Sequence, residues 1–321
     1  MTSPPSRVQL PPGPWRTVLE ALCVRFPGIA ESQWRERFKR GRVLDEAGAP
    51  LPLDAAYRPG AQVRYFREVA AEPDLPGGEY IVHCDADLLV VFKPHYLPVA
   101  PTGAWVRETL LTRLVALTGN TDLVPLHRLD RDTAGLVLFS ARPASRGAYH
   151  ALFRERRIRK FYQALAPALP GLNFPHVHRS RLEAGEPFFR MREVEGEANS
   201  EANSETVVDV LDRNGPAWTY RLEPVTGRKH QLRVHMAALG APILHDRYYP
   251  QLRHQGPDDP ARPLQLTACG LAFQDPLSGR LRRFGIEAEQ DEKGVGKSAA
   301  GACSGSSCPR QPAAPRETSA P

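Results

Sequence analysis

Hydrophobic residues recur along the N-terminal part of this chain with the period of an amphipathic helix. Val18, Leu22 and Phe26 are spaced four residues apart, which predicts a helix ending before the Pro-Gly pair that follows. A second short helix is predicted over 32–39, and a strand over 62–66. Two helices combined with short strands predict a small α/β unit in this part of the chain.

Short apolar runs dominate the larger, C-terminal part of the chain. They predict strands at 80–82, 88–92, 136–139, 161–166, 207–211 and 218–222, and helices at 107–117 and 144–156. The run that contains Leu232 and Met236 fits either a helix or a strand, because both periods place apolar residues on one face. Many short strands with few helices between them predict an α+β fold around a mixed or antiparallel sheet with peripheral helices.

Changes in composition divide the 321 residues into five segments. Residues 1–14, rich in proline and serine, are expected to form a flexible N-terminus, followed by the small α/β module at 15–70. Residues 71–78 are expected to be a linker, and 79–289 the large domain. Residues 290–321 have almost no large apolar side chains and are expected to be a disordered tail.

Charge and cysteine content narrow the class of protein. The formal net charge of +6 favours polyanionic partners. The five cysteines form no CxxC pair, which argues against a disulfide framework and against a zinc site. No apolar run approaches the roughly 20 residues that a membrane helix needs, so a cytoplasmic protein is expected.

A carboxylate stands directly ahead of a predicted buried strand. Asp130 lies in a charged loop before the apolar run 136–139, where Thr133 and Gly135 supply turn chemistry. Reactive groups are often held on irregular backbone by a rigid element. A loop carboxylate is more often a turn former or a member of an ion pair, so the residues alone leave both roles open.

Three motifs in order resemble those of the RluA-type pseudouridine synthases. The first is His127-Arg128-Leu129-Asp130 with Thr133-Ala134-Gly135-Leu136, where the family usually has serine in place of Ala134. The others are Lys160-Phe161-Tyr162-Gln163-Ala164 and Thr226-Gly227-Arg228-Lys229-His230-Gln231-Leu232-Arg233-Val234-His235, with a weaker match at Val90-Val91-Phe92-Lys93-Pro94. The resemblance covers about 79–284 and implies the pseudouridine synthase fold and an isomerase that needs no cofactor.

The same resemblance implies a catalytic trio. Asp130 corresponds to the family's nucleophile, and Arg233 to the arginine that pairs with its carboxylate. Tyr162 corresponds to the tyrosine whose ring stacks on the detached uracil and whose hydroxyl could transfer a proton at C5. Whether Asp130 attacks the base, attacks the sugar or abstracts a ribose proton stays open at this point.

The partner implied is structured RNA bound by a monomeric protein, with ribosomal RNA favoured and transfer RNA possible. Arg128 would fill the gap left by a flipped uridine or contact phosphates. The other predicted RNA-binding residues are basic: Lys93, Arg154, Arg156, Arg157, Arg159, Lys160 and Arg228. His127, His230 and His235 are expected to be structural rather than metal ligands, because no suitably placed carboxylate accompanies them.

Two further alternatives remain open on the sequence. Residues 15–70, with Trp34 among several arginines and lysines, loosely resemble an S4-type RNA-binding module, but could equally be a helical cap on the large domain. The whole chain could also be a catalytically inactive RNA-binding protein on the same fold. The presence of Asp130, Tyr162 and Arg233 favours the enzyme.

Overall fold

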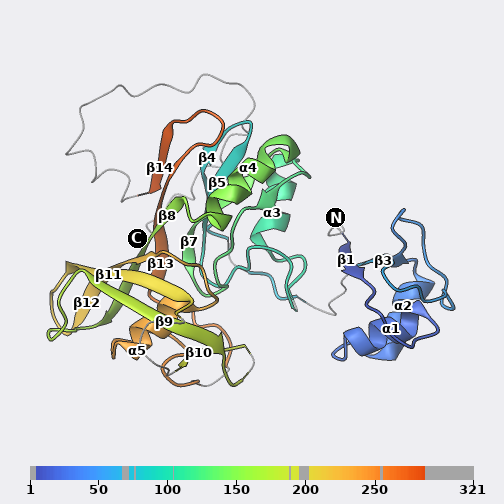
Figure 1. Ribbon diagram of the computed structural model, residues 1–321, viewed down its shortest axis with the longest axis horizontal. Coiled ribbons are helices and arrows are strands. Elements are labelled where there is room, and N and C mark those ends of the chain that lie inside the picture. The colour runs from blue at the N-terminus through green and yellow to red at the C-terminus, as the bar shows by residue number, and fades with distance from the viewer. Residues whose placement is uncertain are drawn as a thin grey trace, which may run out of the picture. The chain divides into compact units, whose positions relative to one another are not determined.

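A computed structural model describes residues 5–66, 72–75, 77–103, 105–187, 189–194, 202–253 and 256–285 (Figure 1). The chain separates into two compact units, one of Met1–Pro73 with Pro101–Arg107 and one of Asp74–Ala100 with Glu108–Pro321. The predicted tail at 290–321 lies outside the described residues. No helix among the described residues is both long enough and apolar enough to cross a membrane.

The first unit is a small α/β module. Helices α1 (Val18–Arg25) and α2 (Glu31–Lys39) accompany a sheet of order β1-β3-β2, formed by β1 (Ser6–Gln9), β2 (Val43–Leu44) and β3 (Gln62–Tyr65). The Thr17 hydroxyl accepts the Glu20 N–H at 3.2 Å and caps α1. Leu22 and Trp34 are fully buried in the core between the helices and the sheet.

The prediction of a flexible N-terminus at 1–14 is wrong for Ser6–Gln9. These residues form β1, which pairs antiparallel with β3 and places Val8 opposite Val63. The proline-rich composition around this strand concealed it, since four residues are too few for alternation to be recognised in sequence.

The boundary between the units also differs from the one expected. Pro101–Arg107 group with the first unit, whereas the sequence assigned them to the large domain. Glu72, in the expected linker, accounts for this grouping: its carboxylate accepts the N–H groups of Val106 and Arg107 at 2.8–2.9 Å.

The second unit is built on a large mixed sheet, which confirms the predicted α+β fold. Its strand order is β10-β9-β11-β12-β8-β13-β7-β5-β4, with β14 beside β13 and β6 beside β7. The strands are β4 (Tyr80–Cys84), β5 (Leu88–Lys93), β6 (Val124–Pro125), β7 (Ala134–Ser140), β8 (Ile158–Pro167), β9 (His176–Ala184), β10 (Met191–Val194), β11 (Ser204–Asp212), β12 (Ala217–Pro224), β13 (Leu266–Gln274) and β14 (Leu281–Gly285). Among the pairs described, β7 with β13 is parallel and the others are antiparallel.

Helices cover both faces of the β5–β7 region. Alternating side chains on β5 and β7 point to opposite faces. One set packs with Leu110 and Leu114 of α3 (Leu110–Thr118), and the other with Tyr149 and Leu152 of α4 (Pro143–Arg154). Both faces of β7 are therefore buried, which makes this strand a rigid support for the loop that precedes it.

A glycine allows β7 and β13 to approach each other. Gly135 has φ of +120°, and a Cβ there would lie 2.2 Å from the Ala268 carbonyl oxygen. Only glycine fits this junction without moving the backbone. Gly135 of the first motif, five residues after Asp130, thus positions the start of β7 beside β13.

The segment around Leu232 and Met236, whose apolar pattern fitted either a helix or a strand, is a helix. Helix α5 (Gln231–Ala238) packs Leu232 and Met236 against Tyr220 and Leu222 of β12. This helix carries Arg233 and is preceded by His230, so the third sequence motif spans a loop and the first turns of a helix.

Candidate active site

Three separate elements of the second unit line one pocket of about 550 Å³. Asp130 comes from the loop before β7, Tyr162 from β8 and Arg233 from α5. Residues up to 103 positions apart along the chain (from 130 to 233) are thus brought to one cavity, as the resemblance implied. The volume falls within the range of small-ligand sites and admits a nucleobase.

Hydrogen bonds to its backbone carbonyl groups fix the Asp130 loop. The Thr133 N–H donates to the Asp130 carbonyl at 3.1 Å. Lys93 Nζ donates to the Arg131 carbonyl at 3.1 Å, and His95 Nδ1 lies 2.7 Å from the Asp132 carbonyl. The loop is therefore held at three consecutive peptide units around the carboxylate.

Lys93 does not belong to an RNA-binding surface, so that prediction is wrong. Its side chain is 0% exposed and also donates to the Pro94 carbonyl at 2.8 Å. Burial lowers the pKa of Lys93 to about 7, although the negative charges of Asp132 and Asp130 act to raise it. In this position Lys93 stabilises the Asp130 loop rather than contacting phosphate.

His127 anchors the start of the loop to β7. Its Nε2 accepts the Leu138 N–H at 3.0 Å, and its ring stacks on Phe153. Burial lowers the pKa of His127 to about 3, with a further contribution from the charge of Lys160. The His127 ring is therefore neutral, with no proton on the Nε2 that accepts the hydrogen bond. This agrees with the structural role expected of His127.

Arg233 makes its strongest ion pair with a residue that sequence reasoning missed. Its Nε and Nη2 each donate to a different oxygen of Asp246 at 2.7 Å, and both side chains are almost fully buried. Its Nη1 lies 3.7 Å from Asp130 Oδ2, so the expected pairing with Asp130 is present as a looser ion pair. Burial lowers the pKa of Arg233, but Asp246 and then Asp130 more than offset it and raise the pKa overall.

Asp246 also shapes the loop around Arg233. Its Oδ1 accepts the N–H groups of Tyr248 and Tyr249 at 2.8 and 3.2 Å. The Arg233 guanidinium lies 4.8 Å from the centre of the Tyr248 ring. A bidentate carboxylate and a ring face therefore fix the guanidinium with one nitrogen directed at Asp130.

Tyr162 and His230 complete the polar wall of the pocket. Burial, and then the charge of Asp130, raise the pKa of Tyr162, so its hydroxyl keeps its proton at neutral pH. His230 Nε2 lies 3.9 Å from Asp130 Oδ2, while its Nδ1 is 2.9 Å from the Tyr249 hydroxyl. Burial lowers the pKa of His230 to about 4, despite the charge of Asp130.

Apart from the buried Lys93, the predicted RNA-binding residues divide into two groups. Arg128, Arg156, Lys160 and Arg228 line the pocket. Arg154 and Arg157 are exposed and pair with Glu155, and Arg159 pairs with Glu223 on the surface. Four of the eight residues therefore surround the cavity that holds Asp130.

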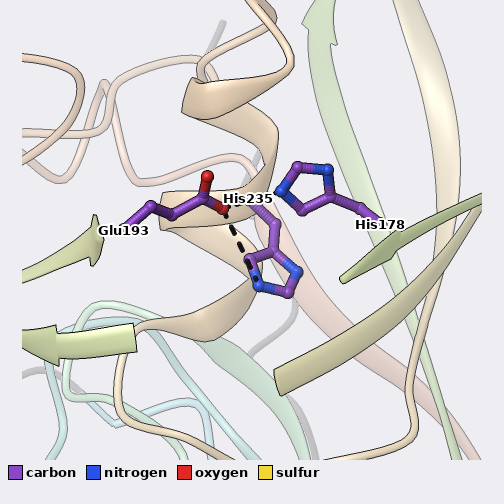
Figure 2. Close-up of side chains that lie close together, drawn as sticks. All are labelled: His178, Glu193 and His235. Atoms are coloured by element: carbon purple, nitrogen blue, oxygen red, sulfur yellow. Dashed lines mark hydrogen bonds and ion pairs between the residues drawn. The ribbon is translucent and has the colours of Figure 1, made fainter. Parts of the chain in front are cut away.

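Two of the histidines expected to lack a carboxylate nearby have one: His230 lies 3.9 Å from Asp130, and His235 lies 4.0 Å from Glu193. Figure 2 shows His235 of α5 beside Glu193 of β10 and His178 of β9. For His235 the expectation was wrong because β9 and β10 were not recognised in the sequence, so neither Glu193 nor His178 could be placed.

Comparison with known proteins agrees with these motifs. The sequence model of the RNA pseudouridylate synthase family matches residues 87–238. An uncharacterized RNA pseudouridine synthase of Synechocystis is 30% identical over 233 residues, which cover 72% of this chain and 79% of that protein. The dual-specificity RNA pseudouridine synthase RluA of Pasteurella multocida is 33% identical over 208 residues, covering 62% of this chain and 88% of that protein.

Solved structures agree on the fold. The human RNA pseudouridylate synthase domain containing 1 is 25% identical with a TM-score of 0.53, covering 67% of this chain and 86% of that one. The chain spans less than two thirds of some other relatives, such as 50% of the tRNA pseudouridine(31) synthase of Saccharomyces cerevisiae, at 31% identity. The fold and the site define an RNA-modifying isomerase, and the chain belongs to the RluA-type RNA pseudouridine synthase family.

Proposed function

We propose that this protein converts uridines of structured RNA to pseudouridines, with Asp130 as the nucleophile. The observation that carries the proposal is the convergence of Asp130, Tyr162 and Arg233 on one pocket. The bond between N1 of uracil and C1′ of the ribose breaks, the base turns, and a bond between C5 and C1′ forms. The hydrogen at C5 leaves as a proton, N1 takes up a proton, and any covalent bond to Asp130 is broken again before the product leaves, so no oxidant, reductant or cofactor is needed.

The environment of Asp130 suits a nucleophile. Its side chain is 24% exposed, and Oδ2 lies 3.7 Å from Nη1 of the Arg233 guanidinium. Because Asp246 supplies the main counter-charge, Arg233 steadies Asp130 without a tight bond that would occupy its oxygens. The carboxylate thus remains available for covalent attack.

Tyr162 is proposed to hold the detached base. Its ring faces the same cavity as Asp130 and offers a stacking surface for uracil. The raised pKa of Tyr162 means that its hydroxyl acts from the protonated state. An acceptor such as the Asp130 carboxylate is then required for the proton at C5.

The target uridine must leave its stack to reach this pocket, which is base flipping. Arg128 is exposed at the pocket wall and can occupy the space that the uridine vacates. Arg156 and Arg228 flank the same opening and suit the phosphates on either side.

The RNA itself is proposed to be ribosomal, with transfer RNA as the second possibility. The first unit, with its two helices, its short strands and its arginines, supports an S4-like RNA-binding role. The names of relatives include a tRNA pseudouridine synthase and a dual-specificity enzyme, which keeps transfer RNA in the proposal. A monomeric, cytoplasmic protein is part of the same proposal.

The test is to map pseudouridines in cellular RNA with and without this protein, and to restore them with the purified chain. The proposal requires at least one uridine whose modification disappears without the protein and returns when it is added. RNA that is bound but never modified would instead identify a catalytically inactive RNA-binding protein.

A further inference from the structure

A second cluster of chemically reactive side chains lies outside the Asp130 pocket. His178 of β9, Glu193 of β10 and His235 of α5 each offer one ligand atom, and these atoms lie within 4.8 Å of one another (Figure 2). His178 Nε2 is 2.7 Å from Glu193 Oε1, and His235 Nε2 is 4.0 Å from the same oxygen. None of the three lines the pocket that contains Asp130.

A hydrogen bond at Nδ1 orients the ring of His235. Its Nδ1 lies 2.9 Å from Thr206 Oγ1, which also accepts the Gln231 side-chain N–H at 2.9 Å. The Thr206 hydroxyl can accept from His235 Nδ1–H or donate to an unprotonated Nδ1, and either hydrogen bond holds the ring in place. In the tautomer with the proton on Nδ1, the lone pair of Nε2 can bind a metal ion. A metal-binding histidine commonly has its second nitrogen held in this way.

Two hydroxyl oxygens lie close to His235 Nε2, with Ser204 Oγ at 3.0 Å and Ser180 Oγ at 3.1 Å. The Ser204 hydroxyl donates to the Ser180 carbonyl at 2.6 Å, so its single proton is already used. The Ser180 hydroxyl lies 3.2 Å from Ser204 Oγ and 3.1 Å from His235 Nε2, and it also makes a hydrogen bond with Glu193. Glu193 Oε1 and His235 Nε2 lie 4.0 Å apart, which is close enough for one cation to bind both.

We propose that His178, Glu193 and His235 bind a divalent transition-metal ion, with Zn²⁺ as the best match. Two imidazoles and one carboxylate are a known zinc donor set that leaves a fourth position for water. With bonds near 2.0–2.1 Å, ligand atoms around tetrahedral zinc are about 3.4 Å apart. The distances of 2.7 and 4.0 Å lie on either side of this value, so small side-chain rotations complete the site.

Access and position suggest a structural role for the ion. The side chains of His178 and Glu193 are 17% and 24% exposed, which lets the ion and its water enter, while His235 is fully buried. The ion would tie the β9–β10 hairpin to α5, the helix that carries Arg233. Its expected effect is on the stability of these elements rather than on the chemistry at Asp130.

The test is a zinc titration of the untagged, chelator-stripped full chain in competition with a chromophoric chelator. Wild type should take up one equivalent that is lost in His178→Gln and in Glu193→Gln, with affinity lower by more than about 100-fold. His150→Gln is the matched control: it makes the same change on helix α4, and it should bind zinc as wild type does. At a hundredfold excess over Kd, zinc should raise the midpoint of thermal unfolding of wild type by about 5 °C.

X-ray absorption of the zinc-loaded wild type adds a measurement that does not depend on whether the variants fold. Nitrogen and oxygen ligands with the scattering pattern of two imidazoles support the site. Sulfur ligands would overturn the proposal, as would the absence of saturable zinc binding or equal affinity in the two variants and wild type.

Discussion

Replacing Asp246 with alanine should damage both the stability of the protein and the geometry of its active site. Asp246 Oδ2 accepts one N–H of Arg233, and Oδ1 accepts another together with the N–H groups of Tyr248 and Tyr249. The carboxylate is 0% exposed and Arg233 only 2%, so water cannot replace the lost partner. The variant leaves a buried guanidinium with Asp130, at 3.7 Å, as its nearest remaining carboxylate.

The expected loss of stability follows from this burial. Removing one partner of a buried ion pair costs about 3–5 kcal/mol, because the other charge stays desolvated and uncompensated. Asp209 offers a matched control, since it pairs with Arg221 at 3.4 Å on the surface of β11 and β12. An ion pair that is about one third exposed contributes about 1 kcal/mol or less, so Asp209→Ala should cost far less.

Equilibrium unfolding in urea measures the unfolding free energies of the Asp246→Ala and Asp209→Ala variants. The rate of pseudouridine formation under native conditions measures the effect of Asp246→Ala on the active site. We expect Arg233 to move toward Asp130 in Asp246→Ala, so that folded protein forms pseudouridine more slowly while still binding RNA. Equal unfolding free energies for the Asp246 and Asp209 variants would refute the reasoning. Wild-type activity in folded Asp246→Ala would show that Arg233 needs no positioning.

Three further perturbations test separate parts of the structure. Gly135→Ala should lower the unfolding free energy by about 3 kcal/mol or more, because its Cβ would overlap a backbone carbonyl of β13. The control is Gly147→Ala in α4, whose Cβ meets open space and which should raise the unfolding free energy by about 0.5–1 kcal/mol. His127 contributes stability that is complete above pH 6.5 and is lost as the pH falls toward 3, because only the neutral ring accepts the Leu138 N–H at Nε2. His127→Gln should therefore flatten the pH dependence of the unfolding free energy between pH 6.5 and pH 3. Arg128→Ala should leave the unfolding free energy within about 0.5 kcal/mol of wild type but weaken RNA binding and reduce its salt slope by about 1; an unchanged salt dependence would remove Arg128 from the RNA interface.

Local patterns in the sequence were sufficient for the elements with strong periodicity. The apolar run of β7 and the helix that became α4 were both recognisable. Strand β13 was missed because it is rich in small residues and carries a bulge between Ala268 and Gly270. Strand β9 was missed because mostly polar side chains leave it without an apolar run. In both cases neighbouring strands, rather than local propensity, determine the conformation.

The active site was predictable only where residues belong to recognisable motifs. Asp130, Tyr162 and Arg233 were expected together, and all three line the pocket. Asp246 lies in a segment without secondary structure, and its importance comes from a contact with Arg233 that no local pattern encodes. Lys93 was misassigned because a lysine in sequence carries no sign of burial, and only the structure shows its hydrogen bond to the Arg131 carbonyl.

The most direct test of the account is pseudouridine formation by Asp130→Asn, compared with wild type and Asp122→Asn. Asp122 is exposed on the segment before β6, so the same change there controls for the loss of a carboxylate. The account predicts that Asp130→Asn binds RNA but forms no pseudouridine, while Asp122→Asn retains wild-type activity. Pseudouridine formation by Asp130→Asn at the wild-type rate would contradict the assignment of Asp130 as the nucleophile.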